Sequence, residues 1–433
     1  MYFKKLILGN FKCFKDFEIS FNKNLTVLVG NNGSGKTSVL EGVAIALSTM
    51  FNPLQGLKSI GINKTQARLK SYKIGSTNDS RPQYPVVVSA EAEINGRDLL
   101  WSRTLNTEKG QTTIKEAKEL ADFSKELQKF LQKGDSSLML PVIAYYGTGR
   151  LWDYHREKSK DVFKKTTRTN GYINSLDGTA NIKLMMNWFR KMTIQKYRNQ
   201  ENGLKGVLEL ETVFSAMEKC YEYASGAKNV KIQYNFDTNE LDVIYLKKNG
   251  KQMRIPLNQL SDGYKSTVSL VADIAYRMAV LNPQCLGDVC AKTDGIVLID
   301  EIDLHLHPLW QQRILKDLAS IFPKVQFIVT THAPEVINSV PKENVVVLEN
   351  LQAFNASVET YGKDANGILR SIMRVQERPA EIMGKFEEFY AAIDDSEYKK
   401  ANEILNKLAK KIGDDPELAA MRTQLEMEQI EVL

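Results

Sequence analysis

A glycine-rich turn follows a short apolar segment near the start of the chain. Residues Leu25–Val29 are apolar apart from one threonine, and the next nine residues read Gly30-Asn31-Asn32-Gly33-Ser34-Gly35-Lys36-Thr37-Ser38. This spacing is that of the Walker A phosphate loop, in which glycines let successive backbone N–H groups converge and the following helix adds its positive end. The motif predicts a polyphosphate site, with Lys36 reaching the β- and γ-phosphates and Thr37 ligating Mg²⁺. A plain glycine turn is the alternative, which the complete pattern disfavours.

A second candidate element is an apolar strand that ends in two acidic residues. Gly295–Ile299 is continuously apolar, and Asp300 and Glu301 follow it directly. In a chain that already holds a phosphate loop, this arrangement predicts a Walker B element: Asp300 would hold Mg²⁺, and Glu301 would orient and polarise the attacking water. Two solvated acids at a strand end are the alternative. His305 and His307 are two residues apart with no evident third ligand, so we interpret both as structural.

Two further segments could face the same phosphates. Val325–Thr330 reads as a buried strand that delivers His332 at its carboxyl end, where ligands of open parallel sheets gather, so we predict that His332 hydrogen-bonds the γ-phosphate. Ser261 and Gly263 stand at the start of a predicted helix, which Ser261 is placed to cap. This place combines a hydroxyl, a glycine and a helix N-terminus, and such a combination favours the binding of an anion.

The elements that must position these residues can be outlined from their periodicity. We expect four regions: an ATPase lobe with the Walker A motif at 1–150, a helical insertion at 151–228, a second ATPase lobe at 229–352 and a helical partner or oligomerisation region at 353–433. Residues 52–85 read as a loop with one short helix around 65–71, 309–322 as one helix, and 345–348 as the last strand of the sheet. The C-terminal helices are amphipathic, which suits either a docking tail or a cap on the protein's own core.

The composition is that of an ordinary globular protein. The chain has 433 residues with a net charge of +6, and this mild excess permits contact with nucleic acid without arguing for it. A basic cluster at 158–168 could meet nucleic acid, although a solvated face is the favoured interpretation. The four cysteines form no C-x-x-C pair, and no signal peptide or membrane-spanning apolar run is visible, so we expect a cytoplasmic protein without a membrane anchor.

Taken together, the segments 30–37, 260–264, 300–301 and 331–332 resemble the motifs of ABC-type ATPases of the RecF, SMC and Rad50 group, in the branch shared with OLD-family proteins. The resemblance implies an α/β fold: an ABC-type P-loop ATPase head with a mixed sheet, flanking helices and an antiparallel β layer. It also implies a homodimer or higher homo-oligomer in which two heads enclose ATP and Mg²⁺, so that Ser261 and Gly263 contact the γ-phosphate held by the partner subunit's Lys36.

The resemblance extends to the N-terminus. At two other places the sequence departs from the group's pattern. Asn10-Phe11-Lys12 is similar to the group's N-terminal segment near the nucleotide, which makes Lys12 a further, weaker candidate. The signature departs from Leu-Ser-Gly-Gly-Gln at Asp262 and Tyr264. No Q-loop glutamine follows Tyr146, so that role stays open, with 147–150 as its suspected equivalent.

More narrowly, residues 144–152, 300–308 and 361–370 resemble the PtuA family, the ATPases of Septu anti-phage systems that also occur beside retrons. This resemblance implies an ATP-binding and ATP-hydrolysing regulatory subunit that controls a separate HNH nuclease (PtuB-like); slow turnover stays open. DNA or retron RNA/DNA stays open as a further partner. A RecF- or SMC-like ATPase of DNA repair and an OLD-like nuclease are the alternatives. OLD nucleases carry a Toprim domain after the ATPase, and its Asp-x-Asp pattern is not evident in the 101 residues after His332, so we predict no nuclease site in this chain.

Overall fold

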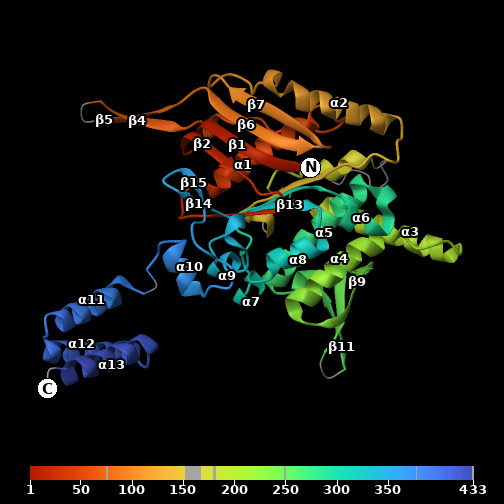
Figure 1. Cartoon of the computed structure of the whole chain (residues 1–433). Helices are drawn as coiled ribbons and strands as arrows, with labels where there is room; N and C mark the ends of the chain where they lie inside the picture. Colours follow the sequence, from red (N-terminus) through yellow and green to blue (C-terminus); the bar gives the residue numbers. More distant parts are fainter. Residues whose placement is uncertain (75–76, 152–166, 179–181, 248–249, 377, 432–433) are drawn as a thin grey trace. The chain divides into compact units, whose positions relative to one another are not determined.

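The computed structural model describes the chain except for residues 75–76, 152–166, 179–181, 248–249, 377 and 432–433 (Figure 1). The basic cluster predicted at 158–168 therefore lies largely outside the described residues. The chain forms two compact units, 1–364 and 365–433.

The first unit is built on a six-stranded sheet. Its strand order is β15-β14-β3-β13-β12-β8, and all neighbours pair in parallel except β15 and β14. Strands β8, β12 and β13 are buried along their whole length and β3 along nearly all of it, as expected of parallel strands covered on both faces. The bounds are β3 (Leu25–Val29), β8 (Val142–Tyr146), β12 (Gly295–Ile299), β13 (Val325–Thr330), β14 (Val345–Glu349) and β15 (Gln352–Asn355).

The prediction that this sheet ends at 345–348 is wrong, because β15 adds an antiparallel edge strand. Asn350 and Leu351 connect β14 to β15, and both have positive φ angles, 50° and 60°. Two such residues form the type of tight turn that matches the twist of a β-hairpin. The polar, four-residue strand β15 carries no apolar alternation that the sequence could have revealed.

A four-stranded antiparallel layer lies beside this sheet, in the order β2-β1-β6-β7. Its strands are β1 (Tyr2–Phe11), β2 (Phe14–Ser20), β6 (Val86–Ile94) and β7 (Arg97–Leu105). Helix α1 (Lys36–Ser48) contacts strands of both sheets, and 11 of its 13 residues are buried. A helix that is apolar on most sides needs such a position between two layers. The predicted α/β fold with a mixed sheet and an antiparallel layer is therefore confirmed.

Residues 52–85 do not form the predicted loop with one short helix. They hold a β-hairpin, β4 (Leu69–Ile74) and β5 (Thr77–Pro82), which extends beyond the antiparallel layer (Figure 1). Where the short helix was expected there is only the single 3-10 turn η2 (Lys64–Gln66). The hairpin strands are mostly exposed, so their sequence has no apolar face for a pattern to detect.

The first unit also holds its remaining helices and a second small sheet, β11-β10-β9, which α3 and α4 contact. This sheet comprises β9 (Lys228–Asn235), β10 (Glu240–Leu246) and β11 (Gln252–Pro256). The helices are α2 (Lys118–Gln132), α3 (Ile182–Glu201), α4 (Leu208–Ser225), α5 (Asp262–Leu281), α6 (Val289–Lys292), α7 (Pro308–Gln311), α8 (Ile314–Ile321) and α9 (Pro334–Ile337). Short 3-10 segments are η1 (Thr49–Phe51), η3 (Lys115–Ala117), η4 (Thr148–Leu151), η5 (Arg168–Tyr172), η6 (Leu257–Gln259), η7 (Pro283–Asp288) and η8 (Lys342–Asn344).

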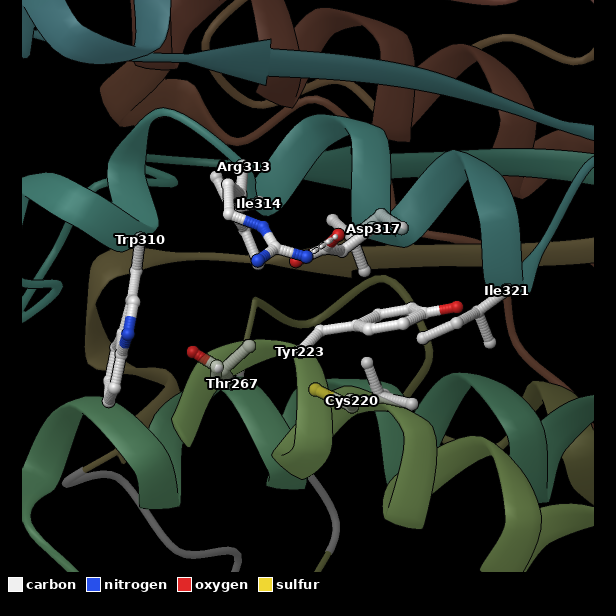
Figure 2. Close-up of a pocket in the computed structure, with 11 residues that line it drawn as sticks. Cys220, Tyr223, Thr267, Trp310, Arg313, Ile314, Asp317 and Ile321 are labelled. Atoms are coloured by element: carbon white, nitrogen blue, oxygen red, sulfur yellow. Dashed lines mark hydrogen bonds and ion pairs between the residues drawn. The ribbon is translucent and has the colours of Figure 1, made fainter. Parts of the chain in front are cut away.

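The single helix expected at 309–322 is instead two helices, α7 and α8. The chain leaves the regular helix at Arg313, whose φ is −117° and whose N–H donates to the Trp310 carbonyl three residues back. Figure 2 shows how the two helices meet α4 and α5: Trp310 and Arg313 face Tyr223 and Thr267. The cavity left between them is about 10 Å³, room for one water at most, so this junction is packed core.

The second unit is a helical bundle with its own core. It contains α10 (Ala365–Ser371), α11 (Ala380–Asp394), α12 (Tyr398–Ile412) and α13 (Pro416–Glu431). The apolar faces of α11, α12 and α13 pack against one another around residues such as Phe386, Phe389 and Leu405. In the described part of the chain, no helix is both long enough and apolar enough to span a bilayer.

Candidate functional site

The phosphate loop joins the end of β3 to the start of α1. Gly35 precedes the helix with a φ of 98°, and a Cβ at this position would lie 2.3 Å from the ring of Phe14. Only glycine fits there, because both the left-handed backbone and the close approach exclude a side chain. The loop therefore lies close against Phe14 at the N-terminus of a buried helix, a position that favours phosphate.

Lys36 is folded back over this loop. Its side-chain Nζ donates hydrogen bonds to the carbonyls of Gly30 at 2.7 Å and Asn31 at 3.1 Å. The residue is only 7% exposed, and this burial lowers the pKa of Lys36, while the carboxylates of Asp300, Glu301 and Asp303 partly oppose the shift. The ammonium group is thus held at the mouth of the loop, where an incoming phosphate could replace the carbonyl oxygens.

Thr37 and Asp300 meet beside the loop. The Thr37 hydroxyl donates to Oδ2 of Asp300 at 2.8 Å, and the Thr330 hydroxyl donates to Oδ1 at 2.6 Å. Asp300 is 3% exposed, so two hydroxyls hold this buried carboxylate in place. A hydroxyl and a carboxylate are the hard oxygen ligands that Mg²⁺ prefers, and the donor set therefore fits this ion.

Glu301 and His332 follow neighbouring strands of the sheet. Glu301 has a φ of 47°, unusual for a residue other than glycine, and its N–H donates to Oγ1 of Thr330 at 2.7 Å. Asp303 accepts hydrogen bonds from the Thr331 hydroxyl at 2.6 Å and the His332 N–H at 3.4 Å. These bonds join the loop after β12 to the end of β13, and so fix both candidate residues at one sheet edge.

The surroundings of His332 disfavour the charged form of its imidazole. Burial lowers the pKa of His332, and the nearby Lys36 ammonium lowers it further, whereas the carboxylates of Asp303, Glu301 and Asp300 act in the opposite direction. A neutral imidazole has one N–H to donate. His332 can therefore donate a hydrogen bond from this N–H to a phosphate oxygen.

A cavity of about 320 Å³ collects most of the predicted site residues. It is lined by Lys12, Cys13, Asn32, Gly33, Gly35, Lys36, Thr37, Ser38, Asp300, Glu301 and His332. Gly30, Asn31 and Ser34 belong to the same loop but are not among the residues that line this cavity. The structure thus brings residues from three strand ends and the first hairpin to one place.

Ser261 and Gly263 do not line this cavity. Ser261 occupies the N-cap position of α5, as predicted, and is exposed, but its side chain makes no capping hydrogen bond within the described structure. A Cβ on Gly263 would lie 2.7 Å from the carbonyl oxygen of His305. The signature segment therefore packs on the loop that follows Glu301 rather than on its own chain's phosphate loop.

Several residues near the site were missed by the sequence analysis. Thr330 and Asp303 hold Asp300 and His332, and Glu41 accepts a hydrogen bond from the ammonium of Lys12 at 2.6 Å. The spacing of Glu41, four residues after Thr37 on one helix face, was the available signal. His307 caps α7 by accepting from the N–H of Leu309, which agrees with a structural role.

The segment expected to replace the Q-loop lies beside the metal ligands. Gly147, Thr148 and Gly149 line a second cavity, of about 520 Å³, together with Thr37 and Asp300. The glutamine among the residues lining this cavity is Gln66, which comes from η2 and not from the segment after β8. The described residues after β8 that line this cavity therefore include no glutamine.

Comparison with known proteins gives three kinds of match. A family model described as an AAA domain matches residues 5–225. The chain is 27% identical to the retron Vc95 probable ATPase of Vibrio cholerae serotype O1 biovar El Tor, over 87% of this chain and 79% of that protein. It is 24% identical to the Septu protein PtuA of Bacillus thuringiensis, over 94% and 92%. A solved SMC head bound to the C-winged helix domain of ScpA covers 83% of this chain and 98% of that chain, with 16% identity and a TM-score of 0.45.

Proposed function

This chain belongs to the AAA-domain family, and on that premise we propose that it is an ATP-binding and ATP-hydrolysing regulatory subunit of an anti-phage defence complex. One observation carries the proposal: Lys36, Thr37, Asp300, Glu301 and His332 line a single cavity at the N-terminus of a buried helix. The similarity to a retron probable ATPase and to a Septu protein supports the role in defence.

The residues of this cavity divide the chemistry among them. The loop N–H groups and Lys36 bind the phosphates of ATP, while Thr37 and Asp300 would hold Mg²⁺, which neutralises phosphate charge when bound. Glu301 accepts a proton from a water whose oxygen attacks the γ-phosphorus. The bond from that phosphorus to the β–γ bridging oxygen breaks, releasing ADP, and the proton leaves with inorganic phosphate. His332 donates a hydrogen bond to a γ-phosphate oxygen.

The complete site requires a second copy of the chain. Ser261 is exposed and lies outside the cavity of its own chain, so its hydroxyl and the N-terminus of α5 are available to a neighbouring molecule. We place Ser261 and Gly263 against the γ-phosphate bound by the partner subunit's Lys36. In this arrangement ATP holds two heads together, and its hydrolysis releases them.

The nuclease activity would reside in a separate HNH subunit (PtuB-like). Slow ATP turnover would suit a switch that depends on whether ATP is bound.

Isothermal titration calorimetry with MgATP and a phage-plaque assay with Lys36→Ala test this proposal. We expect binding by the native chain, and loss of both binding and defence in the variant. Absence of MgATP binding, unchanged defence by the variant, or metal-dependent DNA cleavage by this chain alone would contradict it.

A further inference from the structure

Tyr145 lies beside the nucleotide site, although the proposed mechanism does not use it. It belongs to β8, the strand that pairs with β12. Its side chain lines the cavity of about 520 Å³ together with Thr37 and Asp300. The next residue, Tyr146, points to the opposite face of the sheet, because side chains alternate along a strand, and its hydroxyl donates to Asp273 of α5 at 2.7 Å. The two tyrosines therefore have different surroundings.

The hydroxyl of Tyr145 is buried near two carboxylates. The residue is 8% exposed, and this burial raises the pKa of Tyr145, while the charges of Asp300 and Glu41 raise that pKa further. Among the described residues, none forms a hydrogen bond with this hydroxyl. Buried polar groups in proteins are nearly always hydrogen-bonded. The cavity must therefore supply the partner, either as water or as part of a ligand.

The ring of Tyr145 is held in place by a short segment that lies along the outer edge of β8. The N–H of Tyr145 donates to the Ser175 carbonyl at 2.7 Å. The N–H of Gly147 donates to the Gly178 carbonyl at 2.8 Å. Gly178 has a φ of 77°, and a Cβ at this position would lie 3.3 Å from Cε1 of the Tyr145 ring. The ring thus packs directly on glycine backbone, which restricts its movement and keeps the hydroxyl in the cavity.

The charge of this cavity suits a cation and its water. The charged residues that line it are Glu41, Asp177 and Asp300, which are all acidic. Thr37 and Asp300 line both this cavity and the nucleotide cavity, so Mg²⁺ held by these two residues would border on both. Mg²⁺ in proteins usually keeps several water molecules as ligands. A phenol can accept a hydrogen bond from such a water while it donates its own hydrogen to a carboxylate.

We propose that Tyr145 is a positioning residue of the Mg²⁺ site. Its hydroxyl accepts a hydrogen bond from a water ligand of the ion and donates to the Asp300 carboxylate, which it thereby helps to orient. This inference rests on the proposed function, because it concerns the same ion. A tyrosine that only fills space in the core is the alternative, and a phenylalanine would then serve equally well.

The test compares Tyr145→Phe with the matched control Tyr146→Phe, since each variant loses one hydroxyl from the same strand. Binding of a fluorescent ATP analogue to the full chain is titrated with excess Mg²⁺ and again with EDTA. The ratio of the two dissociation constants measures how much Mg²⁺ strengthens binding. Loss of a residue that hydrogen-bonds to a metal's ligands typically lowers metal affinity at least about tenfold. We expect Tyr145→Phe to reduce the ratio by about this factor, and Tyr146→Phe to keep the native ratio.

Urea denaturation should rank the two variants in the opposite order. Tyr146→Phe loses its bond to Asp273 and should unfold at a lower urea concentration, whereas Tyr145→Phe loses no bond between described residues and should unfold as the native chain does.

Three results would overturn the role of Tyr145 and leave the proposed function intact: an unchanged ratio in Tyr145→Phe, the same reduction in both variants, or binding by Tyr145→Phe that is weakened equally with Mg²⁺ and with EDTA. A native chain that does not bind the analogue, or binds it no better with Mg²⁺, would overturn both.

Discussion

The hydroxyl of Thr37 donates a 2.8 Å hydrogen bond to Oδ2 of Asp300, although 263 residues separate the two in the chain. The fold brings them together because parallel strands β3 and β12, each one strand away from β13, end at the same edge of the sheet. The same edge receives Glu301 and His332. This convergence is the structural basis for assigning an ATP site, and it can be tested residue by residue.

Replacing Lys36 by alanine should remove most of the affinity for nucleotide. The ammonium group lies at the mouth of the loop and exchanges its two carbonyl partners for phosphate oxygens. Hydrogen bonds to charged groups contribute about 1.5–3 kcal/mol each, so Lys36→Ala should weaken MgATP binding at least tenfold. Calorimetry measures this. Lys15→Ala, at a side chain that is 74% exposed, is the control and should bind normally; equal affinities in both variants would refute the assignment.

Glu301→Gln should separate binding from turnover. The amide cannot accept a proton from the attacking water, whereas the phosphate contacts of the loop are unchanged. Loss of a general base lowers kcat by about 10²–10⁴-fold. Steady-state phosphate release and MgATP titration of the same sample measure the two effects, with the exposed Glu343→Gln as the control. If the variant turned over at the native rate, Glu301 would not be the base.

The affinity for nucleotide should fall at alkaline pH earlier than an ordinary lysine would allow. Burial lowers the pKa of Lys36 in the free protein, and bound phosphates raise it again. A group whose pKa is higher in the bound state contributes fully to binding below its free pKa, and that contribution is lost as the pH rises from the free value through the bound value. The dissociation constant for MgATP, measured from pH 7 upward, should therefore increase with pH. In the variant Lys36→Met this dependence on pH should be weaker.

Two glycines of the loop provide a matched test of its geometry. Gly33 and Gly35 both have positive φ angles, 81° and 98°, but an added Cβ meets nothing within 4 Å at Gly33 and the Phe14 ring at Gly35. Gly33→Ala should cost about 1–2 kcal/mol for the left-handed backbone alone. Gly35→Ala should cost about 1–3 kcal/mol more because of overpacking. Urea denaturation measures both, and equal losses would contradict the packing described.

A buried ion pair ties the signature helix to the central sheet. Arg277 and Asp273, both on α5, are joined at 2.7 Å with side chains at most 2% exposed, and Asp273 also accepts from the Tyr146 hydroxyl of β8 at 2.7 Å. Arg277→Met leaves a buried carboxylate without its cation and should cost about 3–5 kcal/mol. The pair of Arg313 and Asp317 has the same spacing, but its Arg313 side chain is 53% exposed, so Arg313→Met should cost only about 1 kcal/mol. Urea denaturation measures the free energy of unfolding of both variants. Similar losses in the two would contradict the stabilising role of the buried pair.

The core strands and the phosphate loop could be predicted because their signals are local. β12 and β13 are continuous apolar runs, and both have the predicted bounds. The hairpin β4–β5 was missed because its strands are exposed and polar. The break between α7 and α8 was missed because the helical spacing of apolar residues continues across Arg313. The roles of Thr330 and Asp303 depend on which strands are neighbours, and a single sequence does not contain that information.

The central claim is that Ser261 of one copy completes the site built on Lys36 of another. Mixing two inactive variants, Lys36→Ala and Ser261→Arg, tests it most directly. In a mixed dimer, one site combines the intact loop of one chain with the intact signature of its partner, and the other site carries both lesions. Random pairing of equal amounts in a symmetric dimer then restores about a quarter of the native ATPase rate. A mixture no more active than the sum of its two components would show that Ser261 serves its own chain or none, and would contradict the account.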